Sequence, residues 1–177
     1  MPWRRRGTTV VDMWWEGAYC GAKWFEGEGP SNRVGRTQVS GFVGRFDHSL
    51  DVKGRVILPA RFRTSFERGG YLTQHHERCL ALWTPGEFDR QMSEMLATTR
   101  DASAAERNFA RVWAAGSVEV EIDRQGRMGI PAGLREFAGL DGEVLVSGAI
   151  DHIELWNPEE WTSRVAPAQA IFLGETE

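Results

Sequence analysis

Hydrophobic and polar residues alternate along several short segments of this chain, as they do in half-buried β-strands. Residues 118–123 alternate cleanly, and residues 152–156 do so again. Short apolar runs that end at polar or glycine-containing segments occupy residues 56–58, 71–73, 79–83 and 143–150. Period-two alternation and bounded apolar runs both predict strands. The chain is therefore expected to be mainly β-structure.

Two longer segments have a helical period instead. Thr84 to Glu87 forms a capping-box pattern, and Ser103 to Glu106 forms another, so each is expected to begin a helix. After the first, apolar side chains fall on one helical face at Phe88, Met92, Met95 and Leu96. We expect this stripe, and the one that follows the second capping box, to pack in the core. Contact with another subunit is the alternative for the second helix.

A thirteen-residue segment occurs twice, at residues 51–63 and, altered, at residues 123–135. The copies lie 72 residues apart, and six positions are identical: an Asp, a Gly, an Arg, a Pro, an Ala and a final Arg. Residues 82–85 (Leu-Trp-Thr-Pro) similarly match residues 155–158 (Leu-Trp-Asn-Pro). A self-match at a fixed offset indicates a duplicated supersecondary unit.

The repeat divides the chain into a first unit at 42–116 and a second at 117–165, with a loose tail expected at 166–177. Residues 1–41 are rich in Gly and Trp and show no helical or strand period. We expect this extension to be disordered, or not normally translated. The alternative is a DNA-binding arm, because residues 4–6 are three consecutive arginines.

Each copy of the repeated segment has the chemistry of a tight turn. The Asp51 carboxylate can accept hydrogen bonds from backbone amides two or three residues further on. Gly54 can supply the positive φ that a tight reversal needs. Asp123 and Gly126 occupy the matching positions of the second copy. These four residues are predicted to tie the turns.

Arg55 has two interpretations. In the first, it forms an ion pair with Asp51 that ties the turn. In the second, its guanidinium is presented to a phosphate or a guanine edge, for which arginine is well shaped. Two equivalent turns carrying Arg55 and Arg127 suit a repeating ligand such as DNA, so the duplication favours the second interpretation.

Residues 42–46, 51–55 and 58–63 closely resemble the start of MraZ proteins. The resemblance continues to about residue 165, and includes the second Asp-x-x-Gly-Arg motif and the strand at 153–156. One such motif would be weak, whereas two in tandem, each followed by a proline and a Leu-Trp strand, are specific.

The resemblance implies an α+β, mainly β fold: tandem AbrB-like swapped-hairpin β-barrel units with short peripheral helices. It also implies a cytoplasmic, nucleoid-associated transcriptional regulator of the division and cell-wall gene cluster. Such a regulator would act as a ring-like homo-oligomer on double-stranded DNA, at G-rich direct repeats upstream of its own gene.

Carried over by position, the resemblance makes Arg55 and Arg127 the principal DNA contacts, with Lys53 and Arg124 beside them. The second copy departs from the first, since Gln125 replaces Lys53, Gly129 replaces Ile57 and Gly133 replaces Arg61. Equal roles for the two repeats are therefore not implied.

The formal charge of −4 over 177 residues argues against a nucleic-acid protein. DNA binding must then rest on a local basic patch, and the first repeat offers one in Arg45, Lys53, Arg55, Arg61 and Arg63. Oligomerisation would multiply these contacts.

Other classes of function find little support. No nucleophile elbow, Gly-rich phosphate loop or metal-ligand spacing is visible, so we expect no enzyme, cofactor or small-molecule substrate. His75 and His76 are adjacent and should point to opposite sides of a strand, so we expect no metal site. No apolar run approaches the length of a membrane span. The alternative function is an antitoxin-like hairpin module that binds a partner protein without specific DNA recognition.

Overall fold

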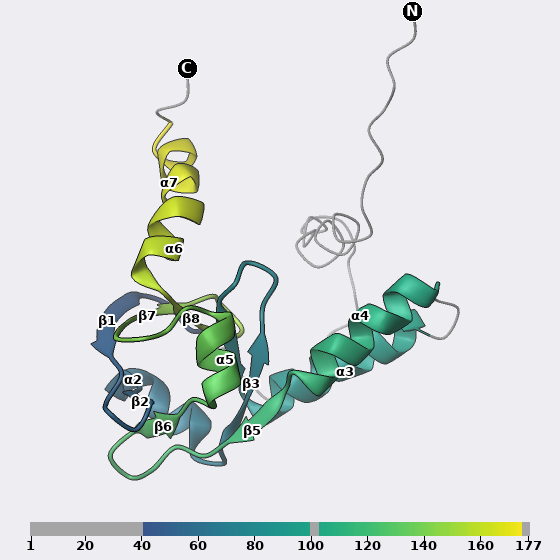
Figure 1. Cartoon of the computed structure of the whole chain (residues 1–177), viewed down its shortest axis with the longest axis horizontal. Coiled ribbons are helices and arrows are strands. Elements are labelled where there is room, and N and C mark those ends of the chain that lie inside the picture. The colour runs from purple at the N-terminus through teal and green to yellow at the C-terminus, as the bar shows by residue number, and fades with distance from the viewer. Residues whose placement is uncertain (1–40, 100–102, 175–177) are drawn as a thin grey trace, which may run out of the picture.

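The computed structural model describes residues 41–99 and 103–174 (Figure 1). The prediction for residues 1–41 therefore lies, apart from Gly41, outside the described part. The first repeat contains β1 (Arg45–Ser49), β2 (Arg55–Ile57), α2 (Ala60–Arg63), a 3-10 turn η1 (Thr64–Phe66), β3 (Gly70–Gln74), β4 (Leu80–Trp83), α3 (Pro85–Thr99) and α4 (Ala104–Ala115). The second contains β5 (Val118–Val120), β6 (Arg127–Gly129), α5 (Ala132–Phe137), β7 (Glu143–Gly148), β8 (Ile153–Trp156), α6 (Pro158–Arg164) and α7 (Ala166–Phe172).

The strands of the two repeats are interleaved in one antiparallel sheet. Its order is β1-β7-β8-β4-β3-β5, and β2 and β6 form a separate two-stranded sheet. The repeat offset makes β5, β6, β7 and β8 the counterparts of β1, β2, β3 and β4. Exchanging the repeats therefore leaves the strand order unchanged, and each repeat adds its first strand to the edge of the other's hairpin.

The predominance of antiparallel strands confirms the mainly β, α+β prediction. The predicted closed barrel is not confirmed, because β1 and β5 are opposite edges of the six-stranded sheet and no strand pairing joins them in the described residues. The AbrB-like form of the units is likewise not confirmed by the strand pairing.

The core lies between the large sheet and the β2–β6 pair. Val56 and Met128 face each other across the small sheet, and both side chains are completely buried. They join one hydrophobic cluster with residues from both repeats, including Leu72 and Leu155. Neither repeat encloses this cluster alone, so the two repeats fold as one unit.

The matched Leu-Trp strands have matching surroundings. Trp83 packs with Phe88 at the start of α3, and Trp156 packs with Trp161 in α6. The packing of these aromatic pairs attaches α3 to the β3–β4 hairpin and α6 to the equivalent β7–β8 hairpin. The duplication inferred from sequence therefore extends to how the helices are attached.

Helices α3 (residues 85–99) and α4 (residues 104–115) form an arm that projects from the sheet (Figure 1). Its base is held by a stack in which Phe88 lies 4.0 Å from Tyr71 and 5.3 Å from Trp113, between ring centroids. The predicted capping box at Ser103 is confirmed, with both of its hydrogen bonds formed.

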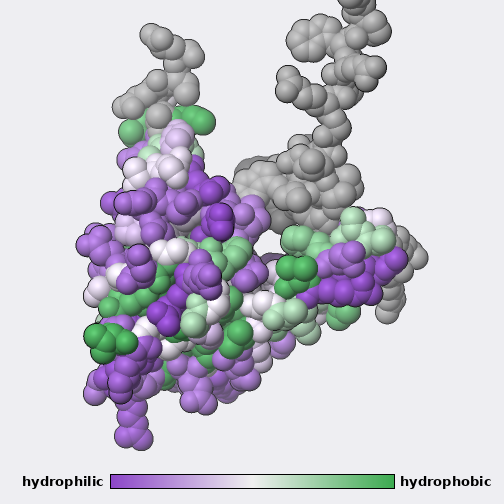
Figure 2. Space-filling model, in the orientation of Figure 1, coloured by the Kyte–Doolittle hydropathy of each residue, from purple (hydrophilic) through white to green (hydrophobic). Residues whose placement is uncertain are grey.

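The prediction that the apolar stripe of α3 is core is wrong beyond Phe88. Met92 is 40% exposed and Leu96 is 64% exposed, because the arm extends past the edge of the sheet. Figure 2 shows hydrophobic side chains at the surface of this arm.

The segment expected to be a loose tail is helical over Ala166–Phe172, and α7 continues from α6 away from the sheet (Figure 1). Ile171 and Phe172 are largely exposed on it. Within the described residues, no helix combines the length and the apolar character that a membrane span requires.

Candidate nucleic-acid interface

The first turn is held by one carboxylate. Asp51 Oδ1 accepts hydrogen bonds from the backbone N–H groups of Lys53 (2.9 Å) and Arg55 (3.0 Å). Asp51 Oδ2 accepts from Arg55 Nε at 2.7 Å and lies 2.6 Å from its Nη2. Gly54 closes the reversal with φ of +71°. The turn is thus a fixed platform on which the Arg55 guanidinium is held in one orientation.

The second turn repeats this geometry almost atom for atom. Asp123 Oδ1 accepts from the N–H groups of Gln125 (2.8 Å) and Arg127 (3.0 Å), and Oδ2 accepts from Arg127 Nε at 2.7 Å. Gly126 has φ of +81°. Both aspartates therefore accept the same set of hydrogen bonds, and both glycines adopt the positive φ of a tight turn.

Both aspartates remain ionised far below neutral pH. Hydrogen bonds from the Arg55 side chain and backbone lower the pKa of Asp51 to about 2. The backbone and side chain of Arg127 also lower the pKa of Asp123. Each turn arginine is consequently paired with a charged carboxylate at any physiological pH.

The two turns are brought together by the pairing of β2 with β6. The register places Arg55 opposite Gly129 and Ile57 opposite Arg127, with Val56 and Met128 between them. Since paired residues point to the same face and that face alternates, Arg55 and Arg127 share the outer face while Val56 and Met128 point inward. We call this outer face the arginine ribbon: Arg55, Ile57, Arg127 and Gly129.

The second repeat has Gly129 where the first has Ile57, and this difference changes what lies beside each arginine. A Cβ atom placed on Gly129 would lie 4.0 Å from Arg55 Cγ, so the Arg55 side chain passes beside this glycine. The other pairing sets Arg127 against Ile57, which is 44% exposed. The two arginines therefore have unequal neighbours, although their own turns are alike.

Each turn is covered by an arginine of the other repeat. Arg63 Nε donates to Leu58 O at 2.9 Å, and its guanidinium lies over Gly126. Arg135 Nε donates to Ile130 O at 3.1 Å, and its guanidinium lies over Gly54. The backbone also crosses between repeats, because Leu58 N–H donates to Gly126 O at 2.8 Å and Ile130 N–H donates to Gly54 O at 3.0 Å.

Arg135 was missed by the sequence analysis, although its counterpart Arg63 was included. The signal was present: the final Arg is one of the six identical positions of the repeated segment. Both side chains are half-buried and bonded to a carbonyl, so they add positive charge behind the turns.

The other predicted basic residues are more dispersed. Lys53 and Arg124 are exposed within the two turns. Arg45 is exposed on the edge strand β1, and Arg61 is exposed on α2 with its guanidinium 5.6 Å from the Phe62 ring centroid. The duplicated turns thus gather Arg55, Arg127, Lys53 and Arg124, whereas Arg45 and Arg61 lie on other elements.

Comparison with known families matches this duplicated geometry. The family described as "MraZ protein, putative antitoxin-like" matches residues 42–112 and again residues 113–173. The chain belongs to the MraZ family. The two matched segments divide the interleaved sheet and place one Asp-x-x-Gly-Arg turn in each.

Three MraZ relatives carry the name transcriptional regulator MraZ. One from Nocardioides sp. is 44% identical over 131 residues, which is 74% of this chain and 90% of the relative. One from Thermomicrobium roseum is 40% identical over 123 residues, covering 70% and 86%. One from Micrococcus luteus is 38% identical over 131 residues, covering 74% and 91%. The matched relatives are named as regulators and not as enzymes.

Proposed function

We propose that this chain is a sequence-specific DNA-binding transcriptional regulator, with the arginine ribbon and its two turns as the DNA-contacting surface. The proposal rests on one observation: Arg55 and Arg127 lie on the same outward face, and each is already held in place by the aspartate of its own turn. Its MraZ relatives are named transcriptional regulators, which supports the same conclusion.

The chemistry of the tied arginines suits base recognition. Arg55 uses Nε and Nη2 for Asp51, and its Nη1 carries two further N–H donors. Arg55 and Arg127 side chains are 32% and 33% exposed, so a ligand can reach guanidinium groups that are already oriented. Pre-orientation reduces the ordering cost of binding, and arginine is the usual partner of the guanine O6 and N7 atoms.

Local charge offsets the acidic balance of the whole chain. Six basic side chains lie at or behind the two turns, against two carboxylates: Lys53, Arg55, Arg63, Arg124, Arg127 and Arg135 against Asp51 and Asp123. A homo-oligomer, ring-shaped in our proposal, would multiply this local excess along a DNA with repeated sites.

The finer parts of the proposal follow the resemblance to the family. The targets are G-rich direct repeats upstream of its own gene, in the division and cell-wall gene cluster, and the protein acts in the cytoplasm at the nucleoid. The units are AbrB-like swapped hairpins, an interpretation supported by the interleaved strand order.

The test measures binding of the full chain to DNA from upstream of its own gene, and to scrambled DNA of equal length, by fluorescence anisotropy in a salt series. Arg55→Ala and Arg127→Ala are compared with Arg164→Ala. Arg164 is an exposed arginine tied to Glu160 at 2.6 Å in α6, and so is a matched arginine–carboxylate pair away from the ribbon.

The upstream DNA should bind more tightly than the scrambled DNA, with affinity that falls steeply as salt rises. Loss of one base-contacting arginine should cost about 1–3 kcal/mol, or roughly 5- to 150-fold in affinity. Arg164→Ala should bind as the parent does. Circular dichroism and size-exclusion chromatography confirm that each variant still folds and assembles.

Equal binding of both DNAs by the folded, assembled protein would overturn the proposal. The antitoxin-like alternative, a hairpin module that binds a partner protein, would then be favoured. Specific binding that survives both ribbon substitutions would retain the DNA-binding function and remove the roles given to Arg55 and Arg127.

A further inference from the structure

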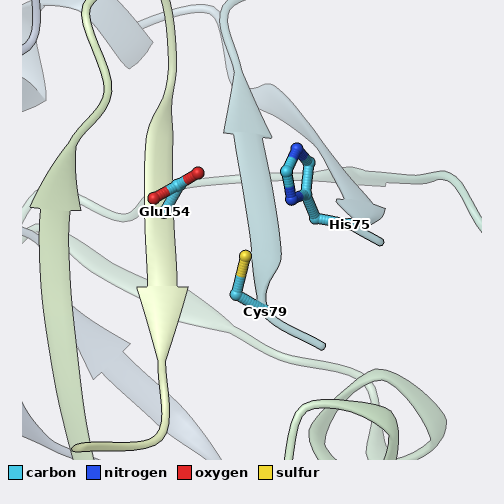
Figure 3. A group of neighbouring side chains, drawn as sticks. All are labelled: His75, Cys79 and Glu154. Carbon is cyan, nitrogen blue, oxygen red and sulfur yellow. The ribbon is translucent and has the colours of Figure 1, made fainter. Parts of the chain in front are cut away.

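A second cluster of reactive side chains lies away from the arginine ribbon. His75 follows β3, Cys79 precedes β4, and Glu154 belongs to β8 of the other repeat. One potential ligand atom from each lies within 4.8 Å of the other two. Figure 3 shows the three side chains around the beginning of β4, with Cys79 where the strand starts, Glu154 on the neighbouring strand to one side and His75 to the other.

The fold brings these residues together from distant positions. His75 and Cys79 flank the β3–β4 hairpin turn, where His75 N–H donates to Cys79 O at 3.0 Å. Glu154 is paired with Ala81 across the β4–β8 ladder, so it lies beside the same hairpin. The β4–β8 ladder is also where the two halves of the interleaved sheet meet.

The cluster contains polar atoms that lack partners. Among the described residues, two buried side-chain nitrogen or oxygen atoms have no hydrogen-bond partner, His75 Nδ1 and His152 Nε2. His152 Nε2 is 3.5 Å from Glu154 Oε1, so both nitrogens belong to the same neighbourhood. A buried polar atom without a partner is unusual and calls for a missing water or ion.

The surrounding contacts orient the remaining ligand atoms. Glu154 Oε2 accepts from Trp156 Nε1 at 2.9 Å, which leaves Oε1 on the side of His152. Asp151 Oδ1 lies 2.7 Å from His152 Nδ1, an arrangement that directs Nε2 toward the cluster. Carboxylate–histidine pairs of this kind commonly support metal-binding imidazoles.

We propose that this cluster binds Zn²⁺ through His75, Cys79 and Glu154, with His152 as the fourth ligand. A thiolate, imidazoles and a carboxylate form a typical ligand set for this borderline-soft cation. Zinc bonds of about 2.0–2.3 Å in a tetrahedron place ligand atoms about 3.3–3.8 Å apart. The ligand atoms of His75, Cys79 and Glu154 already lie within 4.8 Å of one another, so side-chain shifts of about 1 Å would bring these three onto the ion, and His152 would approach from its position beside Glu154. The bound ion would fasten the first repeat's hairpin to β8 of the second.

The expectation of no metal site rested on the lack of a metal-ligand spacing along the sequence and on the adjacent pair His75 and His76, so it did not consider residues that the fold brings together from distant strands. In the structure, ligand atoms of His75, His76 and Glu77 also lie within 4.8 Å of one another. His76 is exposed, however, so this second group lies at the surface of the hairpin. Variants of His76 and Glu77 therefore serve as matched controls, because they share the hairpin and leave the proposed ligands intact.

The experiment uses the full chain with Cys20→Ser, which leaves Cys79 as its single thiol. Chelator-treated protein is titrated with Co²⁺ as a spectroscopic substitute, and bound zinc is counted by elemental analysis after dialysis against Zn²⁺. The parent is compared with His75→Gln, Cys79→Ser, Cys79→Ala and Glu154→Gln, and with the controls His76→Gln and Glu77→Gln.

We expect one ion per chain, a thiolate-to-cobalt charge-transfer band, and a rise in the thermal midpoint with Zn²⁺. Each ligand substitution should weaken binding at least tenfold, the band should vanish in both Cys79 variants, and the controls should match the parent. Using two Cys79 variants guards against a folding defect in either one, and circular dichroism of the metal-free proteins checks all of them.

Three results would overturn the proposal. They are an absence of stoichiometric binding by the folded parent, a charge-transfer band that persists without Cys79, and loss of binding in His76→Gln or Glu77→Gln. The last result would assign the ion to the exposed hairpin group. None of these results bears on DNA binding by the arginine ribbon.

Discussion

Gly54→Ala tests whether the first turn is built as described. Alanine at φ of +71° occupies the left-handed region, which costs about 1–2 kcal/mol for a residue with a side chain. Its Cβ would also lie 2.7 Å from Arg135 Cζ and 2.8 Å from Arg135 Nε. Arg135 must then move off the turn and weaken its bond to Ile130 O, a loss of about 0.5–1.5 kcal/mol.

Together these effects predict a loss of about 2–3 kcal/mol in the free energy of unfolding. The measurement is urea denaturation at a fixed protein concentration, since self-association would otherwise shift the midpoint. Gly133→Ala is the matched control, because this residue lies in α5 with nothing within 4 Å of its added Cβ. It should stabilise the chain by about 0.5–1 kcal/mol.

A double-mutant cycle with Arg135→Ala separates the two causes. In the double variant the backbone strain remains but the steric conflict is gone. The loss of unfolding free energy in the double variant should therefore be about 1 kcal/mol smaller than the sum of the losses in the two single variants. Strict additivity would show that Arg135 does not cover Gly54. A Gly54→Ala variant as stable as the parent would refute the positive φ and with it the turn.

Two further predictions concern the turns and the arm. Hydrogen bonds from the arginines lower the pKa of both Asp51 and Asp123, so the contribution of each carboxylate to stability is complete above the unfolded pKa of about 4. That contribution is lost as pH falls through the folded pKa, which for Asp51 is about 2. The thermal midpoint of the parent should therefore exceed that of Asp51→Asn/Asp123→Asn at neutral pH, by a margin that narrows below pH 4; a constant margin would contradict it. Phe88→Ala should cost about 3–5 kcal/mol because it removes a buried ring from the base of the arm. Met92→Ala, at a 40% exposed position of the same stripe, should change the free energy of unfolding by no more than about 0.5 kcal/mol. Both variants are measured by urea denaturation, and similar losses in the two would show that Met92 belongs to the core after all.

The sequence was most informative where structure depends on nearby residues. The Asp-x-x-Gly-Arg turns are closed by contacts over four positions, so residue types at a fixed spacing were enough to predict them. The repeat then doubled that information. The capping box at Ser103 was also predictable, because its two bonds span three residues.

Features that depend on pairing between distant segments could not be predicted in this way. The periodicity of α3 shows that one face is apolar but not how far the sheet beneath it extends, so Met92 and Leu96 were misassigned to the core. The cover that Arg135 provides for Gly54, and the approach of Glu154 to Cys79, both follow from the interleaving of the two repeats.

Because the interleaved sheet is made by two repeats of one chain, the two ends of the arginine ribbon need not be identical. Two identical chains related by a twofold axis present the same surface to both sides, and such dimers suit palindromic sites. Here the two halves are joined covalently, so the turns have been free to differ: Val52 and Lys53 in one stand where Arg124 and Gln125 stand in the other. Under the proposed function, one end of the ribbon can be distinguished from the other, and successive copies can face the same way along a DNA.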